Sequence, residues 1–388
     1  MPEKTAAPSD GKAGLAPPVE LKFPHAQPPQ NGNVKEIAPG ILWLRMPLPF
    51  QLDHVNIYLI RDGDGWAVLD TGISNDVSKQ AWQQLLGGEL AGEKLTRVIV
   101  THFHPDHIGL AGWLCAQHDI PLLTSYSAYL GCQNLSLDPK SLESRQSFDF
   151  YMQHGMSEET ATLVSTRGHE YLHQVEPLPT TYLRLLLGDM LTIGERRFRV
   201  LSGDGHAPEQ IMLYCEEDRL FFAADQVIAK ISPNISVWAG EPNGDPLGHY
   251  LRSLRWLAAE MPADVLVLPG HQLPFYGLHT RCAELVRHHE FRCDQIMSAC
   301  AERPRTVAEL VPVLFPRPLD PHQMSFAFTE TLAHANRLAR RGDVEWGKQE
   351  SKTLCRLKNR ADLRQYHGVL AEIVGITLTI FNYSSGPR

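Results

Sequence analysis

The chain has 388 residues and contains 36 lysines and arginines against 44 aspartates and glutamates, a net charge of −8. Hydrophobic residues make up 43% and charged residues 21% of the sequence, proportions that are typical of a globular enzyme and exclude a disordered or fibrous chain. The length predicts one large domain and a smaller one, and the acidic balance excludes a protein that attracts nucleic acid by its overall charge.

The chain begins with a segment that is rich in proline and poor in large apolar residues. Seven prolines lie within residues 1–34, which predicts a flexible extension rather than a domain. Patterns typical of strands and helices begin after this segment. Strands are expected at residues 41–45, 56–61, 65–69 and 97–101, and helices at residues 75–86 and 108–118.

A second group of strands follows a long helical stretch. Residues 125–190 form this stretch, and we expect a helical insertion that covers the functional site as a lid. Two groups of strands separated by helices predict an α+β domain over residues 35–275. The later strands are expected at residues 192–201, 211–216, 220–223 and 265–268, with a helix at residues 247–260.

Residues 276–388 change to a mainly helical pattern. Thr306 and Glu309 form a capping box, which predicts the start of a helix. Three helices followed by a hairpin are typical of a winged-helix domain. The other expected elements are a helix over residues 321–341, a hairpin of residues 344–347 and 353–358, and an apolar tail segment at residues 373–383 that packs on the rest.

The cysteines and the apolar runs indicate where the protein resides. The seven cysteines are scattered and never spaced as C-x-x-C, so neither a disulfide framework nor a cysteine zinc site is expected. No run of 18 apolar residues occurs, so we expect no membrane-spanning segment and no membrane partner. The first residues lack the apolar core of a secretory signal, and a cytoplasmic location is therefore expected.

The segment that indicates the chemistry is Thr101-His-Phe-His-Pro-Asp-His107, which follows an apolar strand and leads into a helix. His102 and His104 lie two residues apart on extended backbone and can turn their imidazoles to one metal. Asp106 and His107, at the start of the helix, can face a second metal. Neutral imidazole and carboxylate are the ligands that zinc and similar metals take. Four such residues within one short segment predict a metal site.

Further potential ligands follow apolar strands later in the chain. His206 lies in Gly-Asp-Gly-His-Ala-Pro, Asp225 ends Leu-Phe-Phe-Ala-Ala-Asp, and His271 ends Leu-Pro-Gly-His. Each of them follows a strand, where loops build functional sites. A single residue of this kind is more often structural, but the set of three predicts that distant loops complete the metal site.

These motifs, with Leu-Asp-Thr-Gly at residues 69–72 upstream, resemble the metallo-β-lactamase superfamily. All five signature motifs occur in the family's order over about residues 35–275. The resemblance implies an αββα sandwich of two mixed sheets, with helices outside and the metals at one edge. The stretch from Ser232 through residues 245–254 to Leu-Pro-Gly-His, followed by the helical C-terminus, resembles the branch of the family that has an appended winged helix.

The resemblance also implies a role for each site residue. Asp225 is expected to bridge two metals, as in glyoxalase-II-like members, and this disfavours a β-lactam substrate. Asp70 is expected to orient ligands without binding a metal. Asp106 is the candidate catalytic residue, because it can also orient the nucleophile or move its proton. One metal is expected to bind His102, His104 and His206, and the other Asp106, His107 and His271.

The sequence thus predicts a dinuclear metal-dependent hydrolase that uses a metal-bridging hydroxide on a small ester, thioester or lactone. The expected cofactors are two divalent metal ions, with zinc as the default and iron or manganese compatible with the same ligands. The expected partner is a small acyl substrate, and the sequence leaves open whether the protein forms a homo-oligomer. The alternatives are a metal-dependent ribonuclease, a winged-helix binding protein with a structural metal site, and a mononuclear iron oxygenase. Residues 276–388 hold 16 basic and 12 acidic residues, so residues 1–275 carry a net charge of −12, which disfavours nucleic acid as the substrate.

Overall fold

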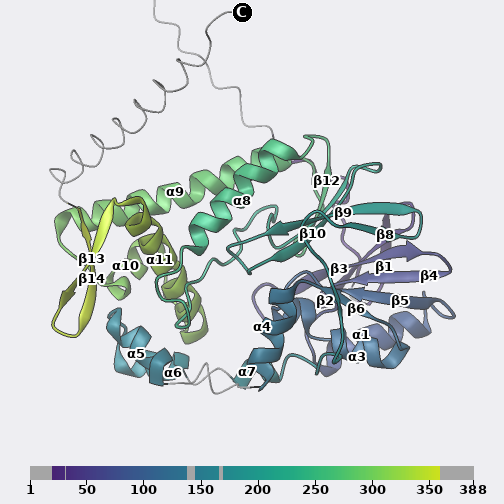
Figure 1. Ribbon diagram of the computed structural model, residues 1–388, viewed down its shortest axis with the longest axis horizontal. Helices are drawn as coiled ribbons and strands as arrows, with labels where there is room; N and C mark the ends of the chain where they lie inside the picture. The colour runs from purple at the N-terminus through teal and green to yellow at the C-terminus, as the bar shows by residue number, and fades with distance from the viewer. Residues whose placement is uncertain (1–19, 31, 138–144, 166–168, 359–388) are drawn as a thin grey trace, which may run out of the picture.

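The computed structural model describes residues 20–30, 32–137, 145–165 and 169–358. In these ranges two β-sheets are stacked between helices, and a helical region follows at the carboxyl end (Figure 1). This is the α+β sandwich with a mainly helical C-terminal region that the sequence predicts. The described helices include none that is long and apolar enough to cross a membrane. The predicted tail segment at residues 373–383 lies outside the described residues.

The first sheet has seven strands that follow one another in chain order. The first four are antiparallel neighbours, and the pairs β4–β5, β5–β6 and β6–β7 are parallel. Parallel neighbours end at the same edge of a sheet, so the loops after these strands meet there. The strands are β1 (Val34–Ala38), β2 (Ile41–Pro47), β3 (His54–Asp62), β4 (Gly65–Leu69), β5 (Lys94–Ile99), β6 (Leu122–Thr124) and β7 (Leu183–Arg184).

The second sheet has five strands in the order β12-β11-β10-β9-β8. Strands β11 and β12 are parallel, and the other neighbours are antiparallel. Strands β9, β11 and β12 therefore run in one direction and end at the same edge. The strands are β8 (Met190–Ile193), β9 (Arg196–Gly203), β10 (Gln210–Cys215), β11 (Leu220–Ala224) and β12 (Leu266–Pro269).

Alternate residues of the strands pack in different layers. In β2, Trp43 faces the other sheet and Leu44 faces the helices, and in β11 Phe222 and Phe221 divide in the same way. This period of two is what a strand buried on both faces requires. Helices α1 (Asp76–Gly87) and α3 (Ala111–His118) cover the first sheet, and α8 (Pro246–Glu260) and α9 (Leu278–Glu302) cover the second. The four layers are the predicted αββα order.

One predicted helix is divided in the structure. The expected helix over residues 108–118 is replaced by α2 (Pro105–Ile108) and α3, with a break at Gly109 and Leu110. The backbone groups at the break bond outside the helix. Leu110 N donates to the Gly72 carbonyl at 3.1 Å, and the Gly109 carbonyl accepts from Glu176 N at 2.8 Å. These contacts fix the Thr101–His107 loop to the turn that follows β4.

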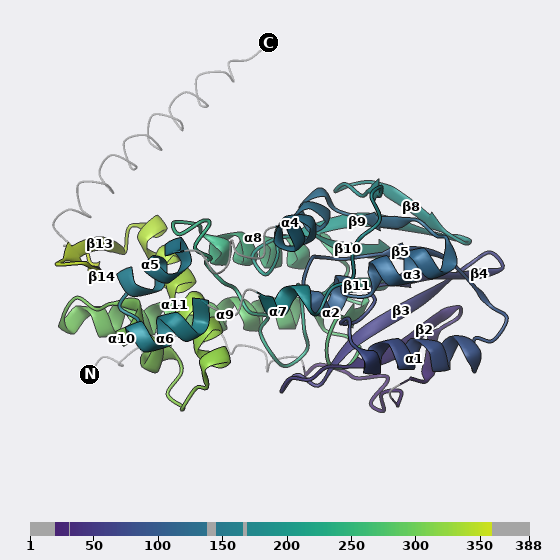
Figure 2. The same ribbon diagram turned by 90° about the horizontal axis from the view of Figure 1, so that it is seen from below.

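The helical insertion contacts both the C-terminal helices and the predicted metal-binding loop. Its helices are α4 (Tyr126–Leu137), α5 (Arg145–Gln153), α6 (Glu158–Ser165) and α7 (His169–Leu172). Figure 2 shows α5 and α6 beside the C-terminal helices. The ring centroids of Tyr151 in α5 and Phe328 in α11 lie 5.6 Å apart. In the short α7, the Tyr171 hydroxyl donates to the Phe103 carbonyl at 2.7 Å, within the predicted metal-binding loop. The role of the insertion as a lid stays a prediction.

The C-terminal region contains three helices and a hairpin, in the predicted order. The capping box of Thr306 and Glu309 is present and starts α10. Helix α11 ends at Gly342, whose φ of 80° is the left-handed conformation that favours glycine. The elements after α9 are α10 (Val307–Leu314), α11 (Pro321–Arg341), β13 (Val344–Gln349) and β14 (Lys352–Leu357), and the two strands are antiparallel. The winged-helix interpretation of this order stays a prediction.

A short piece of the N-terminal segment differs from the expected flexible extension. Lys22 pairs with Tyr276 through two backbone hydrogen bonds of 3.2 and 2.9 Å. Leu21 and Phe23, on either side, pack against the core cluster beneath the second sheet, and the ring of Phe23 lies 6.4 Å from that of Phe275. The expectation of flexibility is therefore wrong for residues 21–23, because their apolar side chains find partners.

Replacing Leu21 and Phe23 together by alanine is expected to lower the free energy of unfolding by about 1–3 kcal/mol, because both side chains are half-buried and apolar. Chemical denaturation of the full chain measures this difference. Lys22→Ala is the matched control, since that side chain is exposed and its backbone hydrogen bonds remain. Equal stability of all the proteins would contradict the prediction.

Candidate metal centre

The predicted site residues all lie at one edge of the sandwich, where strands of both sheets end. Asp70 follows β4, and the Thr101–His107 segment follows β5. From the second sheet, His206 follows β9, Asp225 follows β11 and His271 follows β12. The structure therefore brings together every residue that the sequence indicated for the site, although they are spread over two hundred positions of the chain.

Three histidines form the first group of potential ligands. His102 Nε2 lies 3.0 Å from His104 Nδ1, and His104 Nδ1 lies 3.0 Å from His206 Nε2. His102 is buried, whereas His104 and His206 are partly exposed.

The second group consists of Asp106, His107 and His271, with Asp225 beside it. His271 Nε2 lies 3.3 Å from Asp106 Oδ2, and His107 Nε2 lies 3.6 Å from the same oxygen. Asp225 Oδ2 lies 3.3 Å from His271 Nε2 and 3.5 Å from His107 Nε2. The same oxygen also lies 3.3 Å from His206 Nε2 of the first group. Asp225 thus contacts both groups through one atom.

Backbone carbonyls fix the orientation of two of the histidines. His206 Nδ1 donates to the Asn234 carbonyl at 2.8 Å, and His271 Nδ1 donates to the His54 carbonyl at 2.8 Å. A carbonyl can only accept, so each Nδ1 carries a proton. The Nε2 atoms of both rings consequently face the centre of the site, as in metal-ligating histidines.

Asp70 orients two further histidines. Its carboxylate accepts from Thr101 N at 2.8 Å, from the Thr101 hydroxyl at 2.9 Å and from His107 Nδ1 at 2.8 Å. Because the Thr101 proton points to Asp70, the hydroxyl oxygen accepts from His102 Nδ1, 2.9 Å away. His102 and His107 therefore also present Nε2 to the centre. Asp70 itself has a φ of 62°, a strained conformation of the kind found at functional sites.

The residues fit a bound cation, because five imidazoles and two carboxylates direct potential ligand atoms into one small volume. His104 Nδ1 can donate to either His102 or His206, but not to both. Buried His107 Nε2 and Asp225 Oδ1 have no hydrogen-bond partner among the described residues. Divalent cations would satisfy these nitrogen and oxygen atoms together.

Gly270 allows the second group to close around Asp225. A Cβ atom at this position would lie 2.3 Å from Asp225 Oδ1 and 2.9 Å from His107 Cε1. Neither neighbour can move away without leaving the site. The glycine before His271 is therefore required by space, and the preceding strand can approach the aspartate only without a side chain there.

The two groups of potential ligands differ in the pKa values of their histidines. Burial lowers the pKa of His104 to about 3, so the imidazole is neutral. Burial also lowers the pKa of His271, but the Asp225 and Asp106 carboxylates outweigh it and raise this pKa to about 10. The same carboxylates raise the pKa of His107 well above its ordinary value, against the effect of burial. The second group thus attracts positive charge when no metal is bound.

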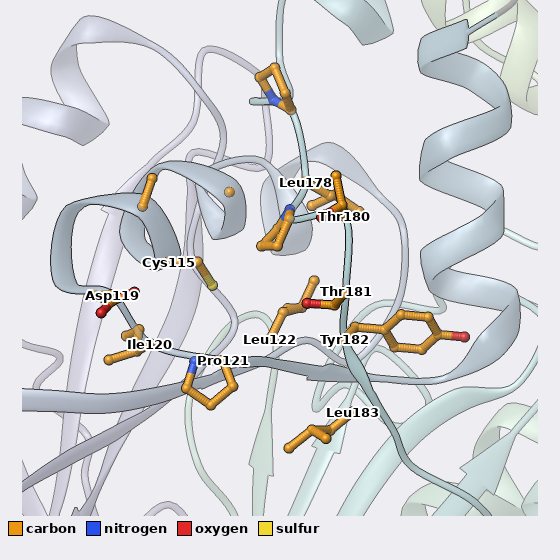
Figure 3. A pocket seen from close by; sticks show the side chains of 14 residues that line it. Cys115, Asp119, Ile120, Pro121, Leu122, Leu178, Thr180, Thr181, Tyr182 and Leu183 are labelled. Atoms are coloured by element: carbon orange, nitrogen blue, oxygen red, sulfur yellow. The ribbon is translucent and has the colours of Figure 1, made fainter.

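A separate cavity of about 640 Å³ lies between α3 and the segment at residues 177–183 (Figure 3). Cys115, Pro121, Leu178 and Tyr182 are among its lining residues. None of the candidate ligands lines it. This cavity is therefore distinct from the metal centre.

A buried cluster in the C-terminal region also has the composition of a metal site. His289, Glu330 and His334 have potential ligand atoms close to one another. However, Arg292 pairs with the Glu330 carboxylate. His334 Nδ1 contacts the Glu330 carbonyl at 2.8 Å, so its Nε2 is free to accept from His289 Nδ1 at 3.1 Å. Hydrogen bonds and an ion pair account for these contacts without a cation.

The sequence did not indicate the groups that accept hydrogen bonds from the outer nitrogens of the ligand histidines. The carbonyls of Asn234 and His54 are backbone atoms, which any residue type supplies, so no pattern could identify them. Thr101 was part of the histidine motif but had no assigned role. Its position directly after the strand and directly before His102 is the one signal that was present.

Comparison with known families agrees with this geometry. The sequence model of the Metallo-beta-lactamase superfamily matches residues 51–271, and that of the Metallo-beta-lactamase-like C-terminal domain matches residues 293–356. The chain therefore belongs to the metallo-beta-lactamase superfamily. It is a hydrolase of that superfamily with a C-terminal domain of the matching type.

Individual relatives cover most of the chain. The crystal structure of a beta-lactamase domain protein from Burkholderia ambifaria is 38% identical, covers 87% of this chain and 98% of its own, and has a TM-score of 0.81. A metallo-beta-lactamase family protein from Thermus thermophilus is 30% identical, covers 83% of this chain and 100% of its own, and has a TM-score of 0.72. The probable metallo-hydrolase YqjP of Bacillus subtilis is 24% identical over 298 residues, which are 76% of this chain and 90% of that protein.

Zinc binding to the metal-free protein at neutral pH is expected to release about two protons, because His107 and His271 hold protons that a metal must displace. Zinc affinity should therefore rise as the pH increases from neutral toward about 10, the pKa of His271. Calorimetric titrations in buffers of different ionisation enthalpy count the released protons. Asp106→Asn, which removes one of the carboxylates, should release fewer. A binding enthalpy that does not depend on the buffer would contradict the prediction.

Proposed function

We propose that the chain is a dinuclear metal-dependent hydrolase of small esters, thioesters or lactones. The observation that supports two metals is the position of Asp225, whose Oδ2 lies 3.3 Å from His206 of the first group and 3.3 Å from His271 of the second. A carboxylate oxygen shared in this way can contact two cations. Five imidazoles and two carboxylates suit zinc, and iron or manganese accept the same ligands.

The proposed chemistry divides between the metals and the side chains that hold them. Bound divalent cations would supply a water of lowered pKa as the nucleophile and positive charge that stabilises a developing oxyanion. His102, His104 and His206 would hold one cation, Asp106, His107 and His271 the other, and Asp225 both. Asp70 and the carbonyl of Asn234 keep the imidazole lone pairs aimed at the cations.

Asp106 has a second task in this proposal. Its side chain is 20% exposed, whereas the His107 and His271 side chains are almost fully buried. It is therefore the member of the second group that solvent reaches. A carboxylate in this position can orient the attacking water and accept its proton.

The C-terminal region supports a small substrate over a nucleic acid. In a winged-helix DNA reader the third helix lies in the major groove and must be exposed. Here residues 327–336 of α11 are all buried. At its end, Arg337 pairs with Asp245 at 3.1 Å and Arg341 pairs with Glu290 at 2.6 Å. The buried middle and the paired arginines leave little of this helix for a duplex.

The relatives and the cysteines add two further points. A linear primary-alkylsulfatase of a Pseudomonas species is 25% identical over 228 residues, which are 42% of that protein, so a sulfate ester belongs among the test compounds. The seven cysteines are all buried and unpaired with one another in disulfides. This state fits a reducing compartment, and we propose a cytoplasmic location.

Asp225→Ala is expected to lose one equivalent of bound metal and nearly all hydrolysis, because the variant lacks the oxygen that both groups share. Elemental analysis of the purified protein gives the metal content, and circular dichroism checks that the fold is retained. Glu217→Ala, an exposed carboxylate on the turn before β11, is the control. Two bound metals and activity within tenfold of the parent would show that Asp225 is not a ligand.

The substrate class is tested with zinc-, manganese- and iron-loaded protein on a panel of a thioester, a lactone, an aryl ester, an alkyl sulfate, a phosphodiester and single-stranded RNA. We expect chelator-sensitive hydrolysis of at least one acyl compound, with kcat/KM reduced by about 10²–10⁴ in Asp106→Asn. Chelator-sensitive cleavage of RNA without acyl hydrolysis would favour the ribonuclease alternative. Oxygen consumption by the iron-loaded protein alone would favour an oxygenase.

A further inference from the structure

The loop between β11 and α8 connects the metal centre to the C-terminal region. It begins with Asp225 and ends at Asp245, the N-cap of α8. Near its middle lies Asn234, whose carbonyl holds the His206 ring. The loop therefore contains a candidate ligand and also the group that orients another ligand.

Two helices of the C-terminal region fix the backbone of this loop. From α9, the buried Arg281 donates to the carbonyls of Ile228 at 2.7 Å and Ile231 at 2.9 Å. From α11, Asn336 Nδ2 donates to the carbonyls of Pro242 at 3.0 Å and Gly244 at 2.9 Å. Such side chain to backbone bonds occupy polar groups of a loop that has no strand partner. The start and the end of the loop are thus both held from outside the sandwich.

The middle of the loop is held by a chain of side-chain hydrogen bonds that starts on α11. Thr329 Oγ1 lies 2.9 Å from the Ser325 carbonyl, which can only accept, so the Thr329 hydroxyl donates there. Ser236 Oγ lies 2.8 Å from Thr329 Oγ1, so the two hydroxyls share a hydrogen bond. Asn234 Nδ2 in turn donates to Ser236 Oγ at 2.7 Å. Hydrogen bonds thus connect α11 to Asn234 without a break.

The chain ends at the metal centre. Asn234 is fixed through its side chain by Ser236, and its carbonyl accepts from His206 Nδ1 at 2.8 Å. A backbone hydrogen bond joins the same loop to α11, because Val237 N donates to the Thr329 carbonyl at 3.3 Å. Thr329 is fully buried and Ser236 is 8% exposed, so water cannot replace either hydroxyl without rearrangement.

We propose that Thr329 is a positioning residue for the metal ligand His206, and that the C-terminal region is in this way a structural part of the metal centre. The proposal rests on the proposed metal-dependent function. It assigns to α11, the helix at the position of a DNA-reading helix, the task of bracing the loop at residues 225–245. Outer partners of metal ligands commonly change metal affinity by about 10–100-fold when they are removed.

Helix α11 contains a matched control for the test. Thr331 is also fully buried, and its hydroxyl donates to the Ala327 carbonyl at 2.7 Å, one turn back, as that of Thr329 does to Ser325. Within the described part of the chain, this hydroxyl makes no hydrogen bond to the loop at residues 225–245. Thr329→Val and Thr331→Val therefore remove the same hydroxyl from the same helix with the same change of shape, and only the first breaks the chain to His206.

Zinc affinity of the full-length protein, measured by competition with a chromophoric chelator, is the primary readout. We expect Thr329→Val to weaken the binding of one zinc ion by about 10–100-fold and Thr331→Val by less than about threefold. Thr329→Ser, which keeps the hydroxyl, should restore the affinity to within about threefold of the parent. The melting temperatures of the metal-free valine variants should agree, which separates positioning from a general loss of stability.

Ser236→Ala removes the hydroxyl that links Asn234 to Thr329, so it breaks the same series of hydrogen bonds from the side of the loop. It is the variant used for the test if Thr329→Val does not fold. It should weaken the same zinc ion by a similar factor, and combining it with Thr329→Val should add little, because both act through one path. Equal zinc affinity in the parent, Thr329→Val and Ser236→Ala would overturn the proposal while the metal-dependent function stands. A parent protein that binds no divalent metal would overturn both.

Discussion

The crowding of potential ligand atoms at one edge of the sandwich is the constraint on which the rest of the structure depends. Imidazole nitrogens and carboxylate oxygens meet there within 3.0–3.6 Å, and burying so many polar atoms together is costly unless protons or cations satisfy them. They stay together because strands of two sheets end there and because hydrogen bonds from His102, His107, His206 and His271 to outer groups fix the orientation of these four rings. Ala224, just before Asp225, adopts a φ of 46°, so the backbone is also strained at this point. The fold supplies the stability that keeps such a site assembled.

The C-terminal region also contributes to keeping the potential ligands together. Its helix α9 joins α8 in burying the outer face of the second sheet, as an ordinary layer of the sandwich does. Its polar side chains have a different task, because Arg281, Thr329 and Asn336 bond to a loop that has no strand partner of its own. Apolar packing sets where the region lies, and these few polar contacts set the geometry of the loop. The two contributions are separable, since each involves its own set of side chains.

The sequence predicted the site residues better than the geometry that holds them. His102, Asp225 and His271 were identifiable because their side chains have few other reasons to follow apolar strands in that pattern. The strand groups and α11 were predicted because periodicity and caps are local signals. The break at Gly109, the packing of Phe23 and the carbonyl of Asn234 were not, because each depends on what lies opposite in space. Tertiary partners of backbone atoms leave no trace in a single sequence.

The position of Thr329 in the sequence has a consequence for the order in which the site is assembled during synthesis. All the candidate ligands, from His102 to His271, precede Thr329 in the sequence. A nascent chain therefore presents the complete ligand set while the helix that fixes the loop at residues 225–245 has yet to be synthesised. Since chains emerge and fold from the amino end, metal captured early meets a site with an unbraced loop. The proposed role of Thr329 therefore makes the docking of the C-terminal helices the last step in assembling the centre.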